Sequence, residues 1–190
     1  MVQTPVKTIT LNEFLQLPET KPYSEFIHDK IIQKPMPQGK HSRIQTKLII
    51  AIDKIASNKP QALAFTELRC TFGRRSIVPD VVVLKYDNIP CDENGDIANR
   101  VNQAPDFTIE ILSPDQNVMK VTNNILYCLN HGCALGWLID PASKSILVYA
   151  PQKQPIFLDN LDNEKEIIPT PNFLADLKLT VGDLFSWLKF

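Results

Sequence analysis

Two short apolar segments, each interrupted by a single carboxylate, constrain the fold of this chain more than any other feature. Residues 77–84 read IVPDVVVL and contain Asp80, and residues 107–112 read FTIEIL and contain Glu110. Runs rich in Val and Ile without polar alternation are typical of strands buried on both faces of a sheet. A lone carboxylate in such a strand is costly unless it is paired or binds a metal. We therefore predict that Asp80 and Glu110 converge on a divalent cation, and oxygen ligands suit Mg²⁺ or Mn²⁺.

Each carboxylate also has an ordinary structural explanation. Asp80 could lie on an edge strand and face solvent, and Glu110 could form an ion pair with an arginine. Taken one at a time, these explanations are as good as the metal site. Taken together, the strongly apolar flanks of both segments favour the metal site.

The periodicity of the remaining sequence predicts a single α/β or α+β domain over residues 1–190, built around a mixed β-sheet. Thr10 and Glu13 form a capping-box pattern at the start of the first helix. Residues 86–105 have no periodic pattern and are predicted to form a long loop. The predicted helices cover residues 10–17, 40–57, 115–131 and 180–187, and the predicted strands cover 25–27, 31–32, 62–70, 76–85, 107–112, 134–139 and 145–149.

The overall composition excludes several classes of protein. A chain of 190 residues that is 44% hydrophobic and 22% charged has the composition of a globular domain, and not of a disordered or fibrous protein. No apolar run approaches the roughly 18 residues of a membrane helix, and the first residues lack the pattern of a signal peptide. The four cysteines show no zinc-like spacing. We therefore expect reduced thiols in a cytoplasmic protein.

Basic residues concentrate in the first part of the chain. Residues 1–79 carry 12 Lys and Arg against 6 Asp and Glu, although the net charge of the whole chain is −1. Arg43 and Lys47 recur at helical spacing in the second predicted helix, and Arg74 and Arg75 lie in the turn before the first carboxylate strand. We predict that these four residues contact the phosphates of DNA. The alternative is that the helix merely has a solvated basic face.

Several blocks of the sequence together resemble the Uma-type putative restriction endonuclease family, a bacterial family of the PD-(D/E)xK nuclease superfamily. The order and spacing of the blocks make the resemblance specific, and it covers about residues 10–188. The blocks that carry it are YSEFIHDK at residues 23–30, His41, Pro79 with Asp80, PDFTIEILSP at residues 105–114, a helix ending at Gly132, and GWLIDP at residues 136–141.

This resemblance implies a restriction-endonuclease-like core, in which helices flank a mixed sheet and metal ligands lie on adjacent strands. It implies that Asp80 and Glu110 bind Mg²⁺ and that Glu25 is an auxiliary acidic residue near the metal. The metal would activate a water for attack on a DNA phosphodiester and stabilise the charge that develops. The only reason to expect His41 near the site is its match to a histidine of the family. The resemblance also makes a homodimer an option, because many nucleases of this fold act as dimers.

The lysine of the superfamily motif is where this sequence departs from the pattern. The motif places a lysine two residues after Glu110, where this chain has Leu112. The family usually shifts that lysine into the next helix, to a place occupied here by Asn124. Lys120 lies one helical step of four residues earlier and becomes the candidate catalytic lysine. Against this assignment, Lys120 lies about 140° from the apolar stripe of its helix, as a solvated residue would.

Three hypotheses about function follow from these observations. The first is a metal-dependent endonuclease that hydrolyses DNA phosphodiester bonds through Asp80, Glu110 and Lys120. The second is a non-catalytic protein of nuclease fold that binds nucleic acid or a protein partner, which the departures at Leu112 and Asn124 favour. The third is a metal-dependent hydrolase with another substrate, because a fold does not determine a substrate.

Overall fold

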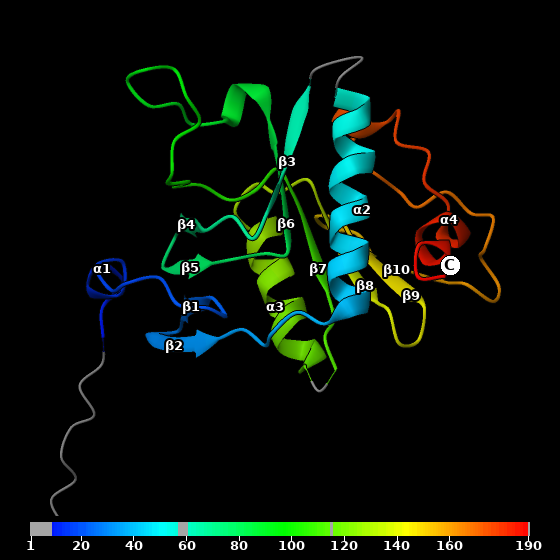
Figure 1. The fold of residues 1–190 in the computed structure, drawn as a ribbon, viewed down its shortest axis with the longest axis horizontal. Coiled ribbons are helices and arrows are strands. Elements are labelled where there is room, and N and C mark those ends of the chain that lie inside the picture. Colours follow the sequence, from blue (N-terminus) through cyan, green and yellow to red (C-terminus); the bar gives the residue numbers. More distant parts are fainter. Residues whose placement is uncertain (1–8, 57–60, 115, 190) are drawn as a thin grey trace, which may run out of the picture.

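The computed structural model describes residues 9–56, 61–114 and 116–189 of the chain. Within these ranges the strands form one sheet of six and one sheet of four (Figure 1). The larger sheet lies in the middle, and the smaller sheet and the first helix lie to one side of it. The last helix lies on the other side. The α-helices are α1 (Leu11–Phe14), α2 (Gly39–Ala56), α3 (Val118–Leu129) and α4 (Val181–Ser186).

The larger sheet is mixed and has the strand order β10-β9-β8-β7-β6-β3. Strands β7 and β8 are parallel, and α3 forms the crossover between them. All other neighbours in this sheet are antiparallel. This arrangement confirms the predicted mixed sheet flanked by helices. The strands are β3 (Ala62–Thr66), β6 (Val81–Lys85), β7 (Phe107–Ile111), β8 (Leu135–Asp140), β9 (Ser145–Tyr149) and β10 (Ile156–Asp159).

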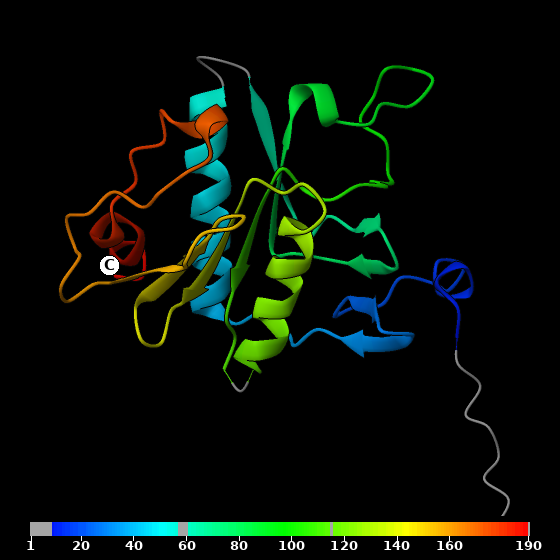
Figure 2. The same cartoon turned by 180° about the vertical axis from the view of Figure 1, so that it is seen from behind.

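Most side chains of the central strands of this sheet are apolar because a helix packs on each face. Helix α2 covers one face and α3 covers the other (Figures 1 and 2). In β6, Val81 and Val83 join the core beside α2, while Val82 and Leu84 join the core beside α3. Burial of each such side chain contributes about 1.5–3 kcal/mol. A charged side chain among them is therefore tolerated only where it finds partners.

The smaller sheet has the strand order β2-β1-β5-β4 and is antiparallel throughout. Its first two strands form the hairpin that the sequence predicts, and the turn residues His28 and Asp29 have φ of 51° and 57°. Positive φ at both turn residues is the geometry of a two-residue hairpin. The strands are β1 (Ser24–Ile27), β2 (Lys30–Gln33), β4 (Cys70–Phe72) and β5 (Arg75–Ile77).

Two predicted strands are each divided in the structure. The predicted strand over residues 62–70 separates into β3 and β4 at Glu67, whose φ of 48° lies outside the extended region. The predicted strand over residues 76–85 separates into β5 and β6 around Pro79, which has no N–H to donate to a sheet. Asp80 therefore lies at the junction of the two sheets, and not inside one continuous strand. Strand β10 was not predicted, because it is a mostly exposed edge strand without clear alternation.

The helix starts predicted from capping patterns are confirmed at α1 and α4, whereas α1 ends at Phe14 and α3 is shorter than predicted. At α1, the Thr10 hydroxyl accepts from the Glu13 N–H and the Glu13 carboxylate accepts from the Thr10 N–H. Thr180 and Asp183 make the same pair at α4. The predicted 86–105 loop contains a short 3₁₀ helix, η1 (Tyr86–Asn88), and a second one, η2 (Asn172–Leu174), precedes α4. No helix of the described residues is long and apolar enough to span a membrane.

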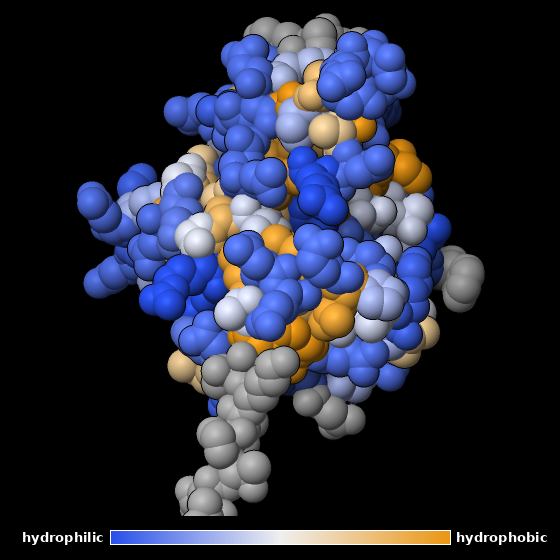
Figure 3. Space-filling model, turned by 90° about the vertical axis from the view of Figure 1, so that its left-hand side faces the viewer, coloured by the Kyte–Doolittle hydropathy of each residue, from blue (hydrophilic) through white to orange (hydrophobic). Residues whose placement is uncertain are grey.

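Helix α1 is held against the smaller sheet by aromatic packing. The rings of Phe14 and Phe26 stack with centroids 5.5 Å apart. Arg69 supports this contact, since its guanidinium lies over the Phe14 ring and forms an ion pair with Glu19. Figure 3 shows apolar residues gathered on this side of the molecule among hydrophilic ones. This packing holds the β1–β2 hairpin in place against α1.

The burial of the cysteines gives a direct test of the packing. Cys70, Cys128 and Cys133 are buried, and only Cys91 is exposed. Burial raises the pKa of Cys70 and of Cys133 to about 12, so their thiols stay protonated and unreactive. At about pH 8 we expect one thiol per chain to react with an aromatic disulfide reagent in the native protein, and all four after unfolding. Reaction of several thiols in the native protein would contradict the described core.

Candidate active site

The two carboxylates predicted from the sequence lie side by side where β6 begins and β7 ends. Val81 pairs with Ile109 in these antiparallel strands, so the next position of the register brings Asp80 beside Glu110. Their exposed fractions are 2% and 3%. The Asp80 carboxylate also accepts a hydrogen bond of 2.7 Å from the Ile111 N–H. The sheet therefore fixes both carboxylates on one buried spot.

Lys34 lies between these carboxylates. Its Nζ donates to Asp80 Oδ1 at 2.7 Å and lies 3.5 Å from Glu110 Oε2. The same Nζ donates to the Val78 carbonyl oxygen at 2.7 Å. The residue directly follows β2, and its side chain is only 11% exposed. Lys34 thus extends from the end of β2 in the smaller sheet and places its positive charge at the edge of the larger sheet.

Glu25 reaches the same place from β1. It is buried, and its Oε1 accepts a hydrogen bond of 2.8 Å from the Val78 N–H. Its Oε2 accepts one of 3.2 Å from Asn124 Nδ2 on α3. The Asn124 Oδ1 is buried without a hydrogen-bond partner in the described residues. The position where the family usually has its lysine is therefore occupied here by an amide that binds a carboxylate.

Helix α2 completes the surroundings of Asp80. His41 Nε2 lies 3.1 Å from Asp80 Oδ2, and Gln45 Nε2 donates to the Asp80 carbonyl oxygen at 2.7 Å. The expectation that His41 lies near the site, which only the family match supported, agrees with this geometry. Its other ring nitrogen, Nδ1, is buried and has no partner among the described residues.

The four charged groups shift one another's pKa in opposite directions. Burial alone would raise the pKa of Asp80, but Lys34 and the hydrogen bond from His41 hold it well below its usual value. The pKa of Glu110 is raised well above its usual value, mainly by burial and further by the negative charges of Asp80 and Glu25. Burial would lower the pKa of Lys34, yet the three carboxylates raise it, so Lys34 is protonated at neutral pH. Neighbouring carboxylates with pKa values pushed apart are a common feature of functional sites.

A cavity of about 430 Å³ leads from the surface to these groups. Glu25, Lys34, Glu110 and Asn124 line it. Lys120 lines it as well, but its side chain is exposed and makes no ion pair within the described part of the chain. The structure thus brings the three predicted acidic residues together with Lys34, and it leaves Lys120 at the rim.

The donor atoms of this site suit a divalent cation. Asp80 and Glu110 both direct an oxygen at Lys34 Nζ, so they already converge on one positive charge. Mg²⁺ is commonly held by one or two carboxylates together with waters and substrate phosphate. Among the described residues, no group of three or more His, Cys, Asp or Glu side chains is arranged to hold a metal ion without such help. Asp80 and Glu110 could therefore hold Mg²⁺ only together with waters or substrate, and Lys34 Nζ lies at the point on which their oxygens converge.

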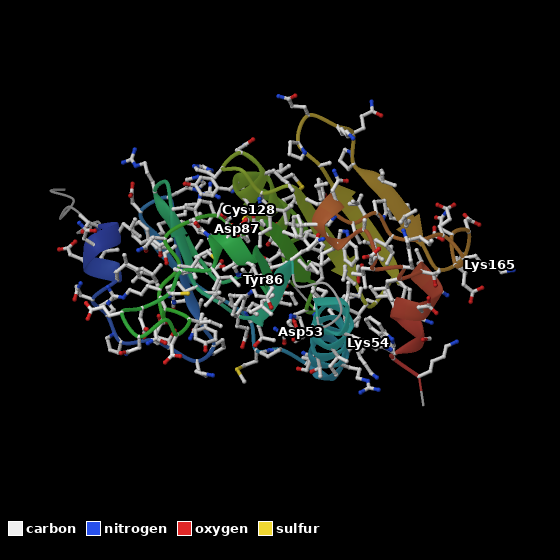
Figure 4. All side chains as sticks on the ribbon, turned by 90° about the horizontal axis from the view of Figure 1, so that it is seen from above. Asp53, Lys54, Tyr86, Asp87, Cys128 and Lys165 are labelled. Carbon is white, nitrogen blue, oxygen red and sulfur yellow. The ribbon has the colours of Figure 1, made fainter. Side chains whose placement is uncertain are left out.

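The residues predicted to contact DNA do not all lie where the sequence suggested. At about 100° per residue, Arg43 lies about 200° around α2 from His41, so the exposed basic side of α2, which includes Lys54 (Figure 4), faces away from the site. Lys47 shares that side and is half-buried. Arg74 is exposed in the turn between β4 and β5.

Arg75 corrects the prediction of a DNA contact in the 72–75 turn. It is only 6% exposed, and its guanidinium lies 3.9 Å from the ring centroid of Tyr127. Its Nη2 lies 2.8 Å from His28 Nε2. Arg75 therefore packs the smaller sheet against α3, where the attraction between its guanidinium and the Tyr127 ring offsets part of the cost of removing the charge from water.

Lys34 is the residue of this site that the sequence did not indicate. It follows a short strand of the hairpin and precedes Pro35, and no periodic pattern marks it. Its place in the site depends on the contact between two sheets, which no local pattern encodes. The one available signal was its position nine residues after Glu25, at the end of the same hairpin.

Comparisons with known proteins found similar ones that are described as putative nucleases. The model of a family described as "Uma2: Putative restriction endonuclease" matches residues 11–182. A crystal structure described as a putative nuclease belonging to DUF820, from Anabaena variabilis ATCC 29413, is 54% identical in sequence and has a TM-score of 0.92. The match covers 95% of this chain and 99% of that one. The comparison with curated proteins gave no match.

Proposed function

The chain belongs to the Uma2 putative restriction endonuclease family, and on this basis we propose that it is a metal-dependent endonuclease that hydrolyses DNA phosphodiester bonds. The proposal includes membership of the PD-(D/E)xK superfamily, with the motif lysine supplied from outside the motif. One observation carries it: Lys34 lies on Asp80 and Glu110 in a buried spot that opens to a cavity. A carboxylate pair with an adjacent ammonium group is suited to phosphoryl chemistry.

Asp80 and Glu110 would hold Mg²⁺ or Mn²⁺, and Glu25 would lie beside them. When bound, the metal supplies positive charge that polarises the phosphodiester and favours ionisation of a water. Burial raises the pKa of Glu110, so a cation that binds there would displace a proton from it. Asp80 is held ionised and is positioned by the Ile111 N–H and His41.

Lys34 would act on the phosphate itself. Its ammonium group has three donors, and in this structure they are directed at Asp80, Glu110 and the Val78 carbonyl. A phosphate oxygen that takes the place of one of these acceptors would receive a charged hydrogen bond. Such a bond is stronger where negative charge develops in the transition state, so it lowers the barrier to attack by water.

The exposed basic residues would supply affinity for DNA that does not depend on its sequence. Since Arg75 is buried, three of the predicted DNA contacts remain as candidates. They are Arg74, and Arg43 and Lys47 on the basic side of α2. The side of α2 that bears Arg43 faces away from the carboxylates, so its contribution would require DNA to wrap around the helix or to contact a second subunit. A homodimer would supply such a surface.

A cleavage assay on supercoiled plasmid tests the proposal. We expect nicked and linear products with Mg²⁺ or Mn²⁺, none when a chelator is present, and none from Asp80→Asn. Asp80→Asn keeps the size of the side chain and removes the charge, and a thermal unfolding curve would show that the variant is folded. A folded wild-type protein that leaves duplex and single-stranded DNA intact at millimolar metal would overturn the proposal.

A non-catalytic nucleic-acid-binding protein is the second candidate, and one observation favours it. Lys34 Nζ already occupies the point on which both carboxylates converge, so an internal ion pair replaces a metal in this arrangement. Such a pair is a known way of joining two parts of a fold with defined geometry. This candidate predicts DNA binding that is independent of metal and is unchanged in Asp80→Asn.

A further inference from the structure

A second cavity of about 580 Å³ lies beside the site, at the beginning of α2. Its walls come from the start of α2, from the segment between β7 and α3, and from the end of β8. Pro114 and Gln116 line both this cavity and the one that leads to Glu110. His41 lines it too and contacts Asp80. The two cavities therefore share a wall of Pro114 and Gln116, and each is lined by a residue of the carboxylate site.

The start of α2 presents free N–H groups at this cavity. The Ser42 N–H is bonded to the Gln38 carbonyl oxygen at 2.9 Å, so the helix begins after Gln38. The N–H groups of Gly39 and Lys40 have no hydrogen-bond partner in the described ranges. A Cβ on Gly39 would meet no atom within 4 Å. The positive end of an 18-residue helix is thus open to a ligand, and such ends favour anions.

His41 gives an independent indication of a ligand, because it lines this cavity and its Nδ1 is buried without a hydrogen-bond partner among the described residues. On the opposite wall, Ser113 is only 8% exposed and lines the cavity. Its hydroxyl makes no hydrogen bond with any residue that the structure describes. Asp140 also lines the cavity, but its carboxylate already accepts hydrogen bonds from the Ala142 N–H and the Ser143 hydroxyl.

We propose that this second cavity binds a phosphate group of the nucleic-acid strand, next to the phosphodiester that is cut. The helix N–H groups, the Lys40 ammonium and the Ser113 hydroxyl would bind its oxygens. The proposal rests on the function proposed above and adds a substrate-positioning site to it. A strand that occupies both cavities would pass over Pro114 and Gln116, which border both, and would reach Glu110 in the first cavity.

Gln38→Asp is the variant that tests this site. Aspartate before a helix accepts hydrogen bonds from the first N–H groups and stabilises the helix, so this variant should fold while its carboxylate competes with phosphate. Gln152→Asp is the matched control, because it adds the same charge on an exposed residue of the loop after β9. Ser113→Ala removes the hydroxyl of the opposite wall. Asp80→Asn tests whether binding depends on the carboxylate site.

The probes are inorganic phosphate and a 5′-phosphorylated thymidine dinucleotide, titrated without metal and followed by amide NMR. We expect the Gly39 and Lys40 amides to shift, and the dinucleotide to bind more tightly than free phosphate. Gln38→Asp should weaken binding of the dinucleotide at least about tenfold, and Ser113→Ala about threefold. Gln152→Asp should stay within about twofold of wild type, because an exposed charge acts weakly at long range.

The outcomes separate this proposal from the nuclease proposal. Dinucleotide binding that Gln38→Asp abolishes, in a protein that does not cut plasmid, would support a phosphate site in the second cavity and reject the nuclease, and with it the role of positioning a substrate for cleavage. Plasmid cleavage by a protein whose Gly39 and Lys40 amides do not shift would reject the phosphate site alone. Equal binding by wild type and Gln38→Asp would also reject it. Binding of free phosphate as tight as that of the dinucleotide would reject a nucleic-acid strand as the occupant.

Discussion

Replacing Lys34 by methionine is expected to lower the free energy of unfolding by about 3–5 kcal/mol near neutral pH. Lys34 is the cation that faces Asp80, Glu110 and Glu25 in the interior, and it is only 11% exposed. Methionine fills a similar volume but leaves the carboxylates without a counter-charge. Urea unfolding of wild type and variant would measure the loss. A variant as stable as wild type would show that Lys34 does not hold the two sheets together.

The same variant should also change how stability depends on pH. In wild type the pKa of Asp80 is lowered, so its contribution to stability is present above the unfolded-state pKa of roughly 4 and is lost as pH falls. Without Lys34, only His41 opposes the effect of burial on Asp80, and the pKa values of Glu110 and Glu25, already raised by burial, rise further, so more stability is lost as pH rises. We therefore expect the difference between wild type and Lys34→Met to shrink from about pH 8 to about pH 5. The double variant Lys34→Met/Asp80→Asn should recover stability relative to Lys34→Met.

Replacing Glu110 by glutamine is expected to lower DNA cleavage at least about a hundredfold without lowering the unfolding temperature. The loss of activity follows from losing one of two cation ligands. Stability should hold because burial raises the pKa of Glu110, which means that its ionised form is unfavourable in the folded protein. A neutral amide removes that cost at higher pH. The measurements are plasmid cleavage rates and thermal unfolding of both proteins at about pH 8.

Glu25→Gln is the matched control for this experiment. Both oxygens of Glu25 already accept hydrogen bonds, from the Val78 N–H and from Asn124. A glutamine could keep the first and donate to the free Asn124 Oδ1. Cleavage should therefore fall less than in Glu110→Gln. Equal losses in the two variants would show that the assigned order of importance among the acidic residues is wrong.

The parts of the site that the sequence predicts are those encoded in single strands. Asp80 and Glu110 were identifiable because each interrupts an apolar run, and the register of β6 and β7 then brings them together. The helix that carries His41 was predictable from its spacing. Its contact with Asp80 was suggested only by the resemblance, because periodicity does not say which partner a helix face meets.

The parts that the sequence did not predict depend on contacts between separate elements. Lys34 reaches the carboxylates only because the smaller sheet docks at the end of β6. Arg75 is basic and lies in a turn region, which suggested a surface contact, yet Tyr127 of α3 covers it. The division at Pro79, which places Asp80 between the sheets, required knowledge that β5 and β6 have different neighbours.

The identity of the lysine is the central claim, and a pair of matched variants tests it most directly. Lys34→Gln and Lys120→Gln each remove one positive charge from a residue that lines the same cavity. With wild type as reference and folding checked by circular dichroism, plasmid cleavage with Mg²⁺ is measured for both. We predict that Lys34→Gln loses at least about a hundredfold in rate and that Lys120→Gln stays within about threefold of wild type. Loss of cleavage in Lys120→Gln with wild-type rates in Lys34→Gln, or a wild type that does not cleave, would contradict the assignment.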